Sequence, residues 1–434
     1  MSAARTWQNW SGLADARPQQ AISPTDAEQV VDAVHAARRQ GLRVKMIGTG
    51  HSFTAIAVTD GLLLRPERLV GVRSVDRSAM TVTVLAGTPL HVLNAALDGL
   101  GLALGNLGDI DRQTVAGAVS TGTHGSGGRW ASLSSQVVRL ELVTADGSLV
   151  TVDAEHDPDL YEAARVGLGA VGVLVAVTFR VEPAFLLAAT EAPMTFTDLV
   201  RGFDELVEQH DHVDVHWFPY TSRALVKRND RTHDDPAPLS RVRAYVDDEL
   251  MANTGFGLVN RVGNVLPRAV PRINRVTARA LTARTYTDTS HKVLVSERRV
   301  RFREMEYAVP RAAGMDALVE ARRVIDRGRW PITFPVEVRF ARAEEPWLAG
   351  AHGRDTVFLS FHVNAATDHT EPFRAVEAVL RDHDGRPHWG KLHTRCHEGL
   401  AGLYPRWHDF RAVRDRVDPD RVFTNVYLDR VLGR

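Results

Sequence analysis

Sulfur chemistry is nearly absent from this chain, because Cys396 is the only cysteine among 434 residues. A lone cysteine excludes an internal disulfide and a metal cluster built on several thiolates. Long apolar runs are missing too: the longest, near residues 169–178, is far short of the roughly 20 residues that span a bilayer. The first residues lack the basic-then-apolar pattern of a signal peptide. We therefore expect a cytoplasmic protein with no membrane partner.

The sequence also lacks an excess of charge of either sign, since 53 Lys and Arg residues match 53 Asp and Glu residues. A protein whose main partner is nucleic acid usually carries a basic excess, so we expect no nucleic-acid partner. The arginine-rich stretch 268–303 is a local exception. We interpret it as a solvated face or an ion-pair network, with DNA binding as the less favoured alternative.

The pattern of apolar residues predicts a mixed α+β fold for the first 185 residues. A helix begins near Thr25, which has capping-box spacing to Glu28, and ends at Gly41. A second helix is expected over 89–97. Asp146-Gly147 predicts a hairpin turn. Strands are expected over 43–47, 81–85, 137–143, 149–152 and 172–181.

The pattern changes after Glu182-Pro183. Strands such as 213–218 and 357–363 alternate there with helices such as 312–327, which indicates a second domain over 186–385. Short helical and loop segments follow over 386–434. With 44% hydrophobic residues, a chain of this length can bury the cores of two or three domains.

Two loops rich in Gly, Ser and Thr suggest a ligand site. The first is Gly48-Thr49-Gly50-His51-Ser52, directly after a predicted strand, and the second runs from Ser120 to Gly128. Glycines allow a ligand to approach the backbone, and successive N–H groups in such turns bind phosphates. Phe53 stands where a Rossmann fingerprint needs its third glycine, and no Walker A lysine follows. Ordinary turn chemistry remains an alternative, and for His51 a hydrogen-bonding turn residue is the plainer interpretation.

Together with blocks further along, these loops resemble the aldonolactone oxidases of the vanillyl-alcohol oxidase (VAO) superfamily. The resemblance covers nearly the whole chain. It is carried by Ile47–Phe53, Thr114–Gly117 with Thr121–Gly127, Pro335–Phe340, Pro387–Lys391, and Asp418-Pro419 with Phe423–Asn425.

The resemblance implies a two-part, PCMH-type FAD-binding domain over 1–185 and a substrate or cap domain with a large antiparallel sheet over 186–385. The segment 386–434 is expected to return to the FAD domain and the active site. His51 matches the position of covalent attachment to the flavin 8α carbon, and Cys396 is too distant in sequence for the second, cysteinyl link of some relatives. The other residues implied in FAD binding are Gly48, Thr49, Gly50, Ser52, Gly108, Thr114, Gly117, Gly122, Thr123, His124, Gly125, Ser126, Gly172 and Val173.

Oxidation of a carbinol requires loss of the hydroxyl proton and passage of a hydride to flavin N5. Glu337 and Arg339 are two apart on a predicted strand and therefore share a face. The pattern alone also allows a surface ion pair; the resemblance implies that both lie in the substrate pocket. It implies further that Lys391 and Arg339 stabilise the developing alkoxide or the flavin N1 charge. His362 matches a substrate-site histidine of alditol oxidases, although a core histidine is an equal alternative.

Two neighbours bear on substrate and oxidant. Asp109 stands where alditol oxidases carry a substrate-contacting serine, which argues against alditols. Gly108 matches a gatekeeper position beside the flavin, where glycine implies access for O2 and formation of H2O2. The resemblance thus implies oxidation of L-gulono-1,4-lactone, D-arabinono-1,4-lactone or a similar lactone by a monomer or small homo-oligomer without a metal. An alditol (xylitol or sorbitol) oxidase, a lactone dehydrogenase with another acceptor, and a flavin carrier without a substrate are the alternatives.

Overall fold

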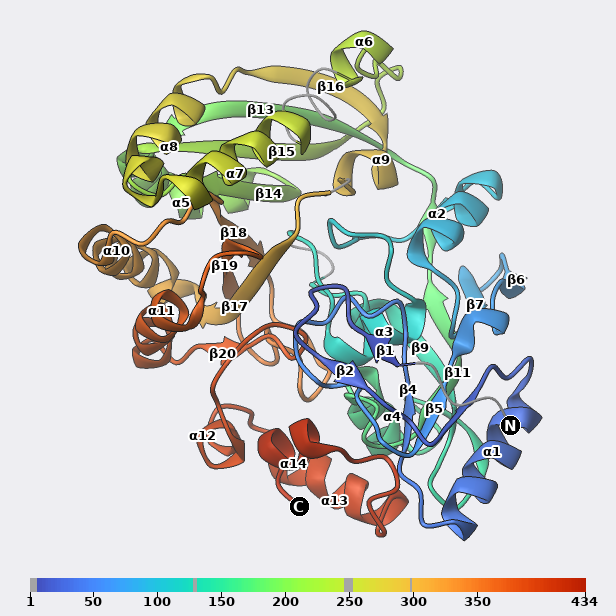
Figure 1. Cartoon of the computed structure of the whole chain (residues 1–434). Coiled ribbons are helices and arrows are strands. Elements are labelled where there is room, and N and C mark those ends of the chain that lie inside the picture. The colour runs from blue at the N-terminus through green and yellow to red at the C-terminus, as the bar shows by residue number, and fades with distance from the viewer. Residues whose placement is uncertain (1–5, 128–130, 246–252, 297–298) are drawn as a thin grey trace.

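The computed structural model describes residues 6–127, 131–245, 253–296 and 299–434, which form an α+β protein (Figure 1). Two sheets and four helices make up the N-terminal part. The parallel sheet has the order β3 (Gln20–Ile22), β5 (Leu62–Leu64), β4 (Val44–Met46). The antiparallel sheet has the order β10 (Leu149–Asp153), β9 (Val137–Val143), β11 (Val173–Arg180), β7 (Thr81–Leu85), β6 (Val72–Asp76). The helices are α1 (Ala27–Arg39), α2 (Leu90–Gly99), α3 (Val115–Thr121) and α4 (Pro158–Arg165). Two short pairs complete this part: β1 (Trp7–Gln8) with β2 (Asp15–Ala16), and β8 (Leu102–Ala103) with β12 (Glu182–Pro183).

Local sequence signals account for most of these elements. The hairpin of β9 and β10 turns at Gly147, whose φ of 87° confirms the predicted turn, and Gly41 ends α1 at a φ of 65°. The predicted capping box is wrong by one residue. The carboxylate of Asp26, not Thr25, accepts a hydrogen bond from Gln29 N, and the Gln29 side chain accepts one from Thr25 N. The cap bond spans three residues from Asp26 to Gln29, whereas the reciprocal bond reaches back four residues to Thr25.

The larger sheet has eight antiparallel strands. Their order is β16 (Arg284–Thr289), β13 (Leu186–Thr195), β15 (Arg223–Thr232), β14 (His212–Trp217), β18 (Val336–Ala341), β19 (Thr356–Asn364), β17 (Phe302–Pro310), β20 (Arg386–Pro387). The helices of this part are α5 (Phe196–Gln209), α6 (Arg241–Ala244), α7 (Phe256–Val265), α8 (Val270–Arg279), α9 (Ser290–Leu294), α10 (Arg311–Gly328) and α11 (Thr370–Asp382). The predicted boundary at residue 185 falls between β12 and β13.

The two faces of this sheet differ in character. Val215, Val338, Leu359 and Tyr307 lie in register on one face and pack against apolar side chains of α5, α10 and α11. Because side chains alternate along a strand, the residues between them point to the opposite face. That face is turned toward the N-terminal part and carries polar side chains.

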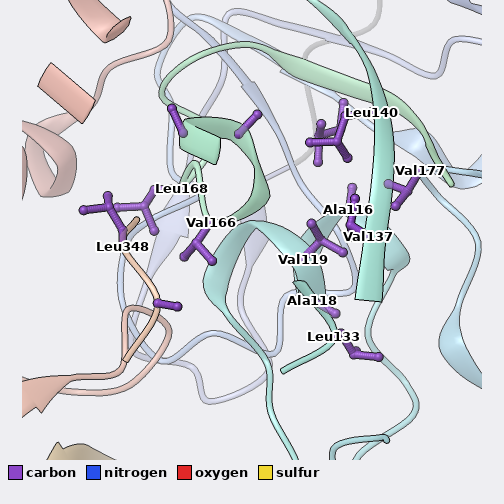
Figure 2. Close-up of a cluster of buried hydrophobic side chains, with 14 of the residues drawn as sticks. Ala116, Ala118, Val119, Leu133, Val137, Leu140, Val166, Leu168, Val177 and Leu348 are labelled. Atoms are coloured by element: carbon purple, nitrogen blue, oxygen red, sulfur yellow. The ribbon is translucent and has the colours of Figure 1, made fainter. Parts of the chain in front are cut away.

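The C-terminal segment packs against the N-terminal part. Its helices are α12 (His397–Ala401), α13 (Trp407–Val417) and α14 (Val426–Leu432). Phe410 and Leu428 join the same apolar cluster as Val119 of α3 and Leu140 of β9, part of which is drawn in Figure 2. Among the described residues, no helix is both long and apolar enough to cross a lipid bilayer.

Candidate active site

A row of polar side chains crosses four neighbouring strands of the large sheet. His216 on β14 lies opposite Glu337 on β18, which lies opposite Ser360 on β19, which lies opposite Glu306 on β17. A parallel row contains Asp214 and Arg339, and another contains His362 and Glu304. Apart from His216 and Asp214, these side chains are buried. A buried polar face of this kind requires partners for every charge.

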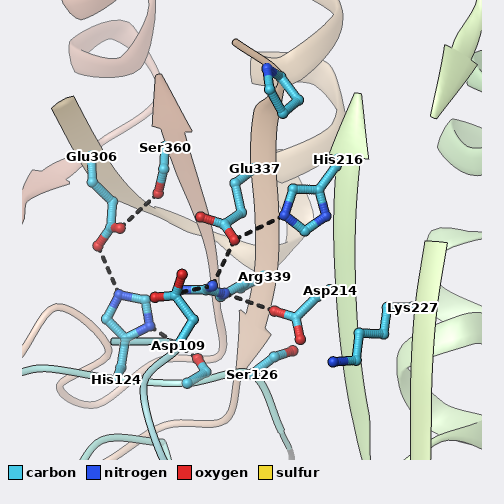
Figure 3. A network of polar contacts seen from close by, with 12 residues as sticks. Asp109, His124, Ser126, Asp214, His216, Lys227, Glu306, Glu337, Arg339 and Ser360 are labelled. Carbon is cyan, nitrogen blue, oxygen red and sulfur yellow. Dashed lines mark hydrogen bonds and ion pairs between the residues drawn. The ribbon is translucent and has the colours of Figure 1, made fainter. Parts of the chain in front are cut away.

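Arg339 is the centre of one buried network (Figure 3). Its Nε donates to Asp214 at 2.7 Å, and its guanidinium donates to Glu337 at 2.6 Å and lies 3.5 Å from Asp109. His216 Nε2 lies 3.2 Å from the same Glu337 oxygen. Burial alone would lower the pKa of Arg339, but the neighbouring carboxylates outweigh it and hold the pKa well above its usual value. Arg339 is therefore a fixed cation in a fixed orientation.

Lys391 is the second fixed cation. It pairs with Glu304, whose other oxygen lies 3.4 Å from His362 Nε2. Burial opposes ionisation of both partners, yet Lys391 and His362 lower the pKa of Glu304 to about 2, and the two glutamates on β17 raise the pKa of Lys391. Next to this pair, Glu306 accepts hydrogen bonds from Ser360 at 2.6 Å and meets His124 at 2.7 Å.

His124, Glu306 and His388 bring ligand atoms within 4.8 Å of one another. Such a trio could hold a metal ion. Lys391, however, acts electrostatically on both Glu306 and His388, and a fixed ammonium group disfavours a second cation there. We therefore interpret the trio as a hydrogen-bonded wall of the site.

Two adjoining cavities link this network to the glycine loops. One, of about 330 Å3, is lined by Gly108, Asp109, Thr123, His124, Arg339, His388 and Lys391, among others. The other, of about 100 Å3, is lined by residues that include Lys45, Gly48, Thr49, Gly50, Thr114, Gly117, Gly172, Val173 and Phe423. His51, Ser52, Gln113 and Thr121 belong to both linings. The two cavities therefore adjoin at these four residues.

The first glycine loop is held by segments from both ends of the chain. Trp10 N donates to Gly50 O at 2.8 Å, and Phe53 N donates to Gly390 O at 2.6 Å. A Cβ at Gly48 would lie 2.4 Å from Thr114 Oγ1, so only glycine allows the loop to approach α3 this closely. The loop is consequently a rigid wall of both cavities.

His51 stands where the two cavities meet. Its ring stacks on Trp10 with 5.9 Å between centroids. Burial, with smaller contributions from Lys391 and Arg112, lowers the pKa of His51 to about 4. The imidazole is thus neutral near pH 7, and a neutral imidazole nitrogen is a nucleophile.

The second glycine loop divides its residues between two tasks. Thr121, Thr123 and His124 line the cavities, whereas Gly122, Gly125 and Ser126 lie outside both linings. Gly122 ends α3 at a φ of 73°. The Ser126 hydroxyl donates to Val213 O on β14, and Gly127 N donates to Phe340 O on β18 at 2.9 Å. Half of the predicted cofactor loop therefore fastens the N-terminal part to the large sheet, and Gly128 is outside the described residues.

The predicted catalytic residues also fall into two groups. Lys391, Arg339 and Asp109 line the larger cavity, while Glu337 and His362 lie behind them, bonded to Arg339 and beside Glu304. Sequence reasoning missed Asp214, Glu304, Glu306 and His388. A signal for two of these exists, since Glu304-Met305-Glu306 has the same two-residue spacing within an apolar strand as Glu337-Val338-Arg339.

Comparison with known proteins identifies the family. The sequence profile of D-arabinono-1,4-lactone oxidases matches residues 177–431, and that of an FAD-binding domain matches residues 18–153. The L-gulono-1,4-lactone dehydrogenase of Mycobacterium tuberculosis is 39% identical over 98% of this chain and 99% of its own length. The chain belongs to the aldonolactone oxidase family.

Other members of the family are also similar over their whole length. The L-gulonolactone oxidase of Mus musculus is 31% identical over 98% of both chains, and the alditol oxidase of a Streptomyces species is 33% identical over 100% of both. A solvent-stable cholesterol oxidase, at 18% identity, superposes with a TM-score of 0.82 over 99% of this chain and 97% of its own. This family member is thus an FAD-dependent oxidoreductase with the VAO-type fold.

The residues of the two cavities fit FAD. The lining of the smaller cavity includes Gly48, Gly50, Gly117 and Gly172, where a diphosphate can approach backbone N–H groups. Side chains are disfavoured at two of these glycines, because a Cβ at Gly172 would lie 2.6 Å from Leu142 Cδ1 and Gly50 has a φ of 76°. The larger cavity, with its fixed cations and the His51 ring at its edge, suits the flavin ring and a substrate.

Proposed function

We propose that this protein oxidises L-gulono-1,4-lactone or a closely similar aldonolactone, with O2 as the final acceptor and H2O2 as the product. The observation that carries the proposal is the convergence of two carboxylate-held cations, Arg339 and Lys391, on the cavity that also contains His51 and Gly108. When bound there, FAD supplies the hydride acceptor that no amino-acid side chain can provide.

The residues of the cavity provide orientation and charge. Arg339 and Lys391 donate hydrogen bonds to the substrate oxygen as negative charge develops on it, and one such donor typically contributes about 2.7–4 kcal/mol. Asp109 offers acceptor oxygens to sugar hydroxyls. Glu337 and Asp214 keep Arg339 oriented, Glu304 does the same for Lys391, and His362 supports Glu304. Arg339 is thereby already oriented toward the developing charge and does not have to move during the reaction.

We further propose that FAD is attached covalently through His51. The neutral imidazole supports this assignment, as does its position between the cavities. A histidine that only packs in the turn would also be neutral. Release of the flavin by denaturant therefore distinguishes a packing role of His51 from covalent attachment.

The proposed activity is tested by a panel of aldonolactones and alditols offered to the purified flavoprotein, with peroxide detection in air beside an artificial electron acceptor. We expect turnover of lactones, formation of H2O2 and weak turnover of xylitol and sorbitol. If no lactone or alditol bleaches the flavin under anaerobic conditions, the proposal is wrong and a flavin carrier is favoured.

Two other outcomes have support. The relative from M. tuberculosis is named a dehydrogenase, so turnover with the artificial acceptor but without peroxide would assign a lactone dehydrogenase. The Streptomyces relative is named an alditol oxidase, so a preference for xylitol or sorbitol would assign an alditol oxidase. This chain has Asp109 in the cavity, at the position where a serine is expected in alditol oxidases.

A further inference from the structure

Helices α7 and α8 each place a polar side chain against the rest of the protein. Each buries an asparagine that is 1% exposed: Asn260 accepts a hydrogen bond from Thr333 at 2.5 Å, and Asn274 donates to the carbonyls of Pro219 and Ile332 at 3.1 and 2.9 Å. An ordinary surface helix places its polar side chains in water and its apolar ones in the core. Here Asn260 and Asn274 are buried beside Gly263, Val270 and Ala278, so polar and apolar residues share the contact with the rest of the protein.

Several apolar side chains of α7, α8 and the turn between them are exposed. Leu258, Val262 and Val265 follow one another at helical spacing on α7 and are 61%, 39% and 78% exposed. Leu266 and Val276 extend the exposed set at 57% and 67%. Five of the twelve large apolar side chains exposed among the described residues thus lie within 19 positions of the chain. Clustered exposure of this kind marks a contact surface.

The same helices carry positive charge only. Between Asn253 and Ala283 there is no Asp, Glu or Lys, but there are five arginines, at 261, 268, 272, 275 and 279. Arg272, Arg275 and Arg279 share the exposed side of α8 with Val276. Among the described residues none of the five forms an ion pair with a carboxylate. We call the five apolar residues and five arginines the α7–α8 face; Figure 1 shows these helices beside the large sheet, at the end of the molecule away from α13 and α14.

We propose that the α7–α8 face docks the enzyme reversibly on an anionic phospholipid membrane. Exposed Leu and Val side chains enter the headgroup region, while arginines contact lipid phosphates with their stems along the apolar surface. A second copy of the chain is disfavoured because it would bring ten arginines together. Nucleic acid would use the arginines but leave the apolar side chains without a partner. The proposal departs from our expectation of no membrane partner, which rested on the lack of a spanning segment.

The test is flotation of the full-length flavoprotein with vesicles of phosphatidylcholine, with and without 30% phosphatidylglycerol (about a third anionic lipid). We expect binding to the anionic vesicles only, weakened by salt. The variants Arg272→Glu/Arg275→Glu and Leu258→Asp/Val265→Asp should each lower the partition coefficient by about tenfold or more. Because the readout is lipid binding, the result is independent of the proposed lactone oxidation.

Matched controls are Arg374→Glu on α11 and Val426→Asp at the start of α14, both exposed and remote from the face. These should bind like the parent protein, and the flavin absorbance of every variant reports folding. Absence of binding to anionic vesicles, or equal loss in the controls, overturns the proposal. Two other results would also overturn it. One is that the protein does not bind vesicles but forms a concentration-dependent dimer that Val265→Asp abolishes. The other is that the protein binds DNA and not vesicles.

Discussion

At the scale of single residues, the site depends on charges that hold one another in place. Arg339 is held by Asp214 and Glu337 with Asp109 nearby, whereas Lys391 is held by Glu304. Removal of either cation should slow anaerobic reduction of the flavin by lactone about 10²-fold, the cost of one lost oxyanion donor. Stopped-flow absorbance of Arg339→Ala and Lys391→Ala measures this. Lys292→Ala, an exposed lysine, is the control, and unchanged reduction rates would remove both cations from the mechanism.

His51 provides a test of covalent attachment. We expect His51→Ala to release its flavin into the supernatant after precipitation with acid, whereas the parent protein keeps a yellow pellet. The physical reason is that the neutral nitrogen that forms the link is gone. His35→Ala, a histidine on the exposed side of α1, should retain the flavin. Flavin that stays with precipitated His51→Ala would contradict the assignment.

Gly108 tests access of O2 to the flavin. A Cβ there would lie 2.9 Å from Thr123 Cγ2 and 3.2 Å from His124 O, so alanine fits only if Thr123 yields and the wall moves inward. We expect Gly108→Ala to slow reoxidation in air by about tenfold or more, with reduction by lactone changed much less. Gly99→Ala, with open space around its Cβ, is the control. Equal rates of reoxidation would discard the gatekeeper role.

At the scale of elements, α14 is tied to the flavin-binding part through its first residue. The Asn425 amide donates to the carbonyls of Ala55, Ile56 and Val58, and its oxygen caps Leu428 N. Asn425→Ala removes the cap and leaves buried carbonyls unpaired. We expect a loss of about 2–4 kcal/mol in the free energy of unfolding, measured by urea titration. The neighbouring Val426→Ala, 81% exposed, should be near neutral, and equal stability of the two variants would contradict the proposed tether.

Elements governed by local chemistry could be predicted from the sequence. Alternation identified β7 and β9, and Gly41 and Gly147 identified the end of α1 and the hairpin turn. The site was only partly predictable, because its contacts join strands far apart in the chain. Glu306 meets His124 across 182 residues, and no local pattern records that pairing. The fastening role of Ser126 was missed for the same reason.

At the scale of the whole molecule, the free energy of unfolding should decrease as the pH is lowered through the mildly acidic range. Burial lowers the pKa of His388 to about 4 and that of His393 to about 3. The unfolded chain binds protons at these histidines near pH 6.5, whereas the folded protein does not. The free energy of unfolding therefore decreases as the pH drops from 6.5 toward 4. Glu304 continues the loss below about pH 4.5, because its folded pKa is about 2.

Urea titrations at pH 7.5, 6, 5 and 4 check this dependence. We expect the free energy of unfolding to decrease by several kcal/mol over the series, with part of the loss absent in His393→Phe. A flat profile would show that these histidines are protonated in the folded protein.

The position of Phe423 and Asn425 has a consequence for synthesis on the ribosome. Val422 O accepts a hydrogen bond from Val44 N, and Phe423 lines the same cavity as Gly48. The flavin-binding half therefore lacks one wall until translation has passed Phe423. A nascent chain therefore cannot bind FAD before the segment around Phe423 has been synthesised. A premature stop shortly before Asp418 would abolish flavin uptake while leaving both glycine loops intact.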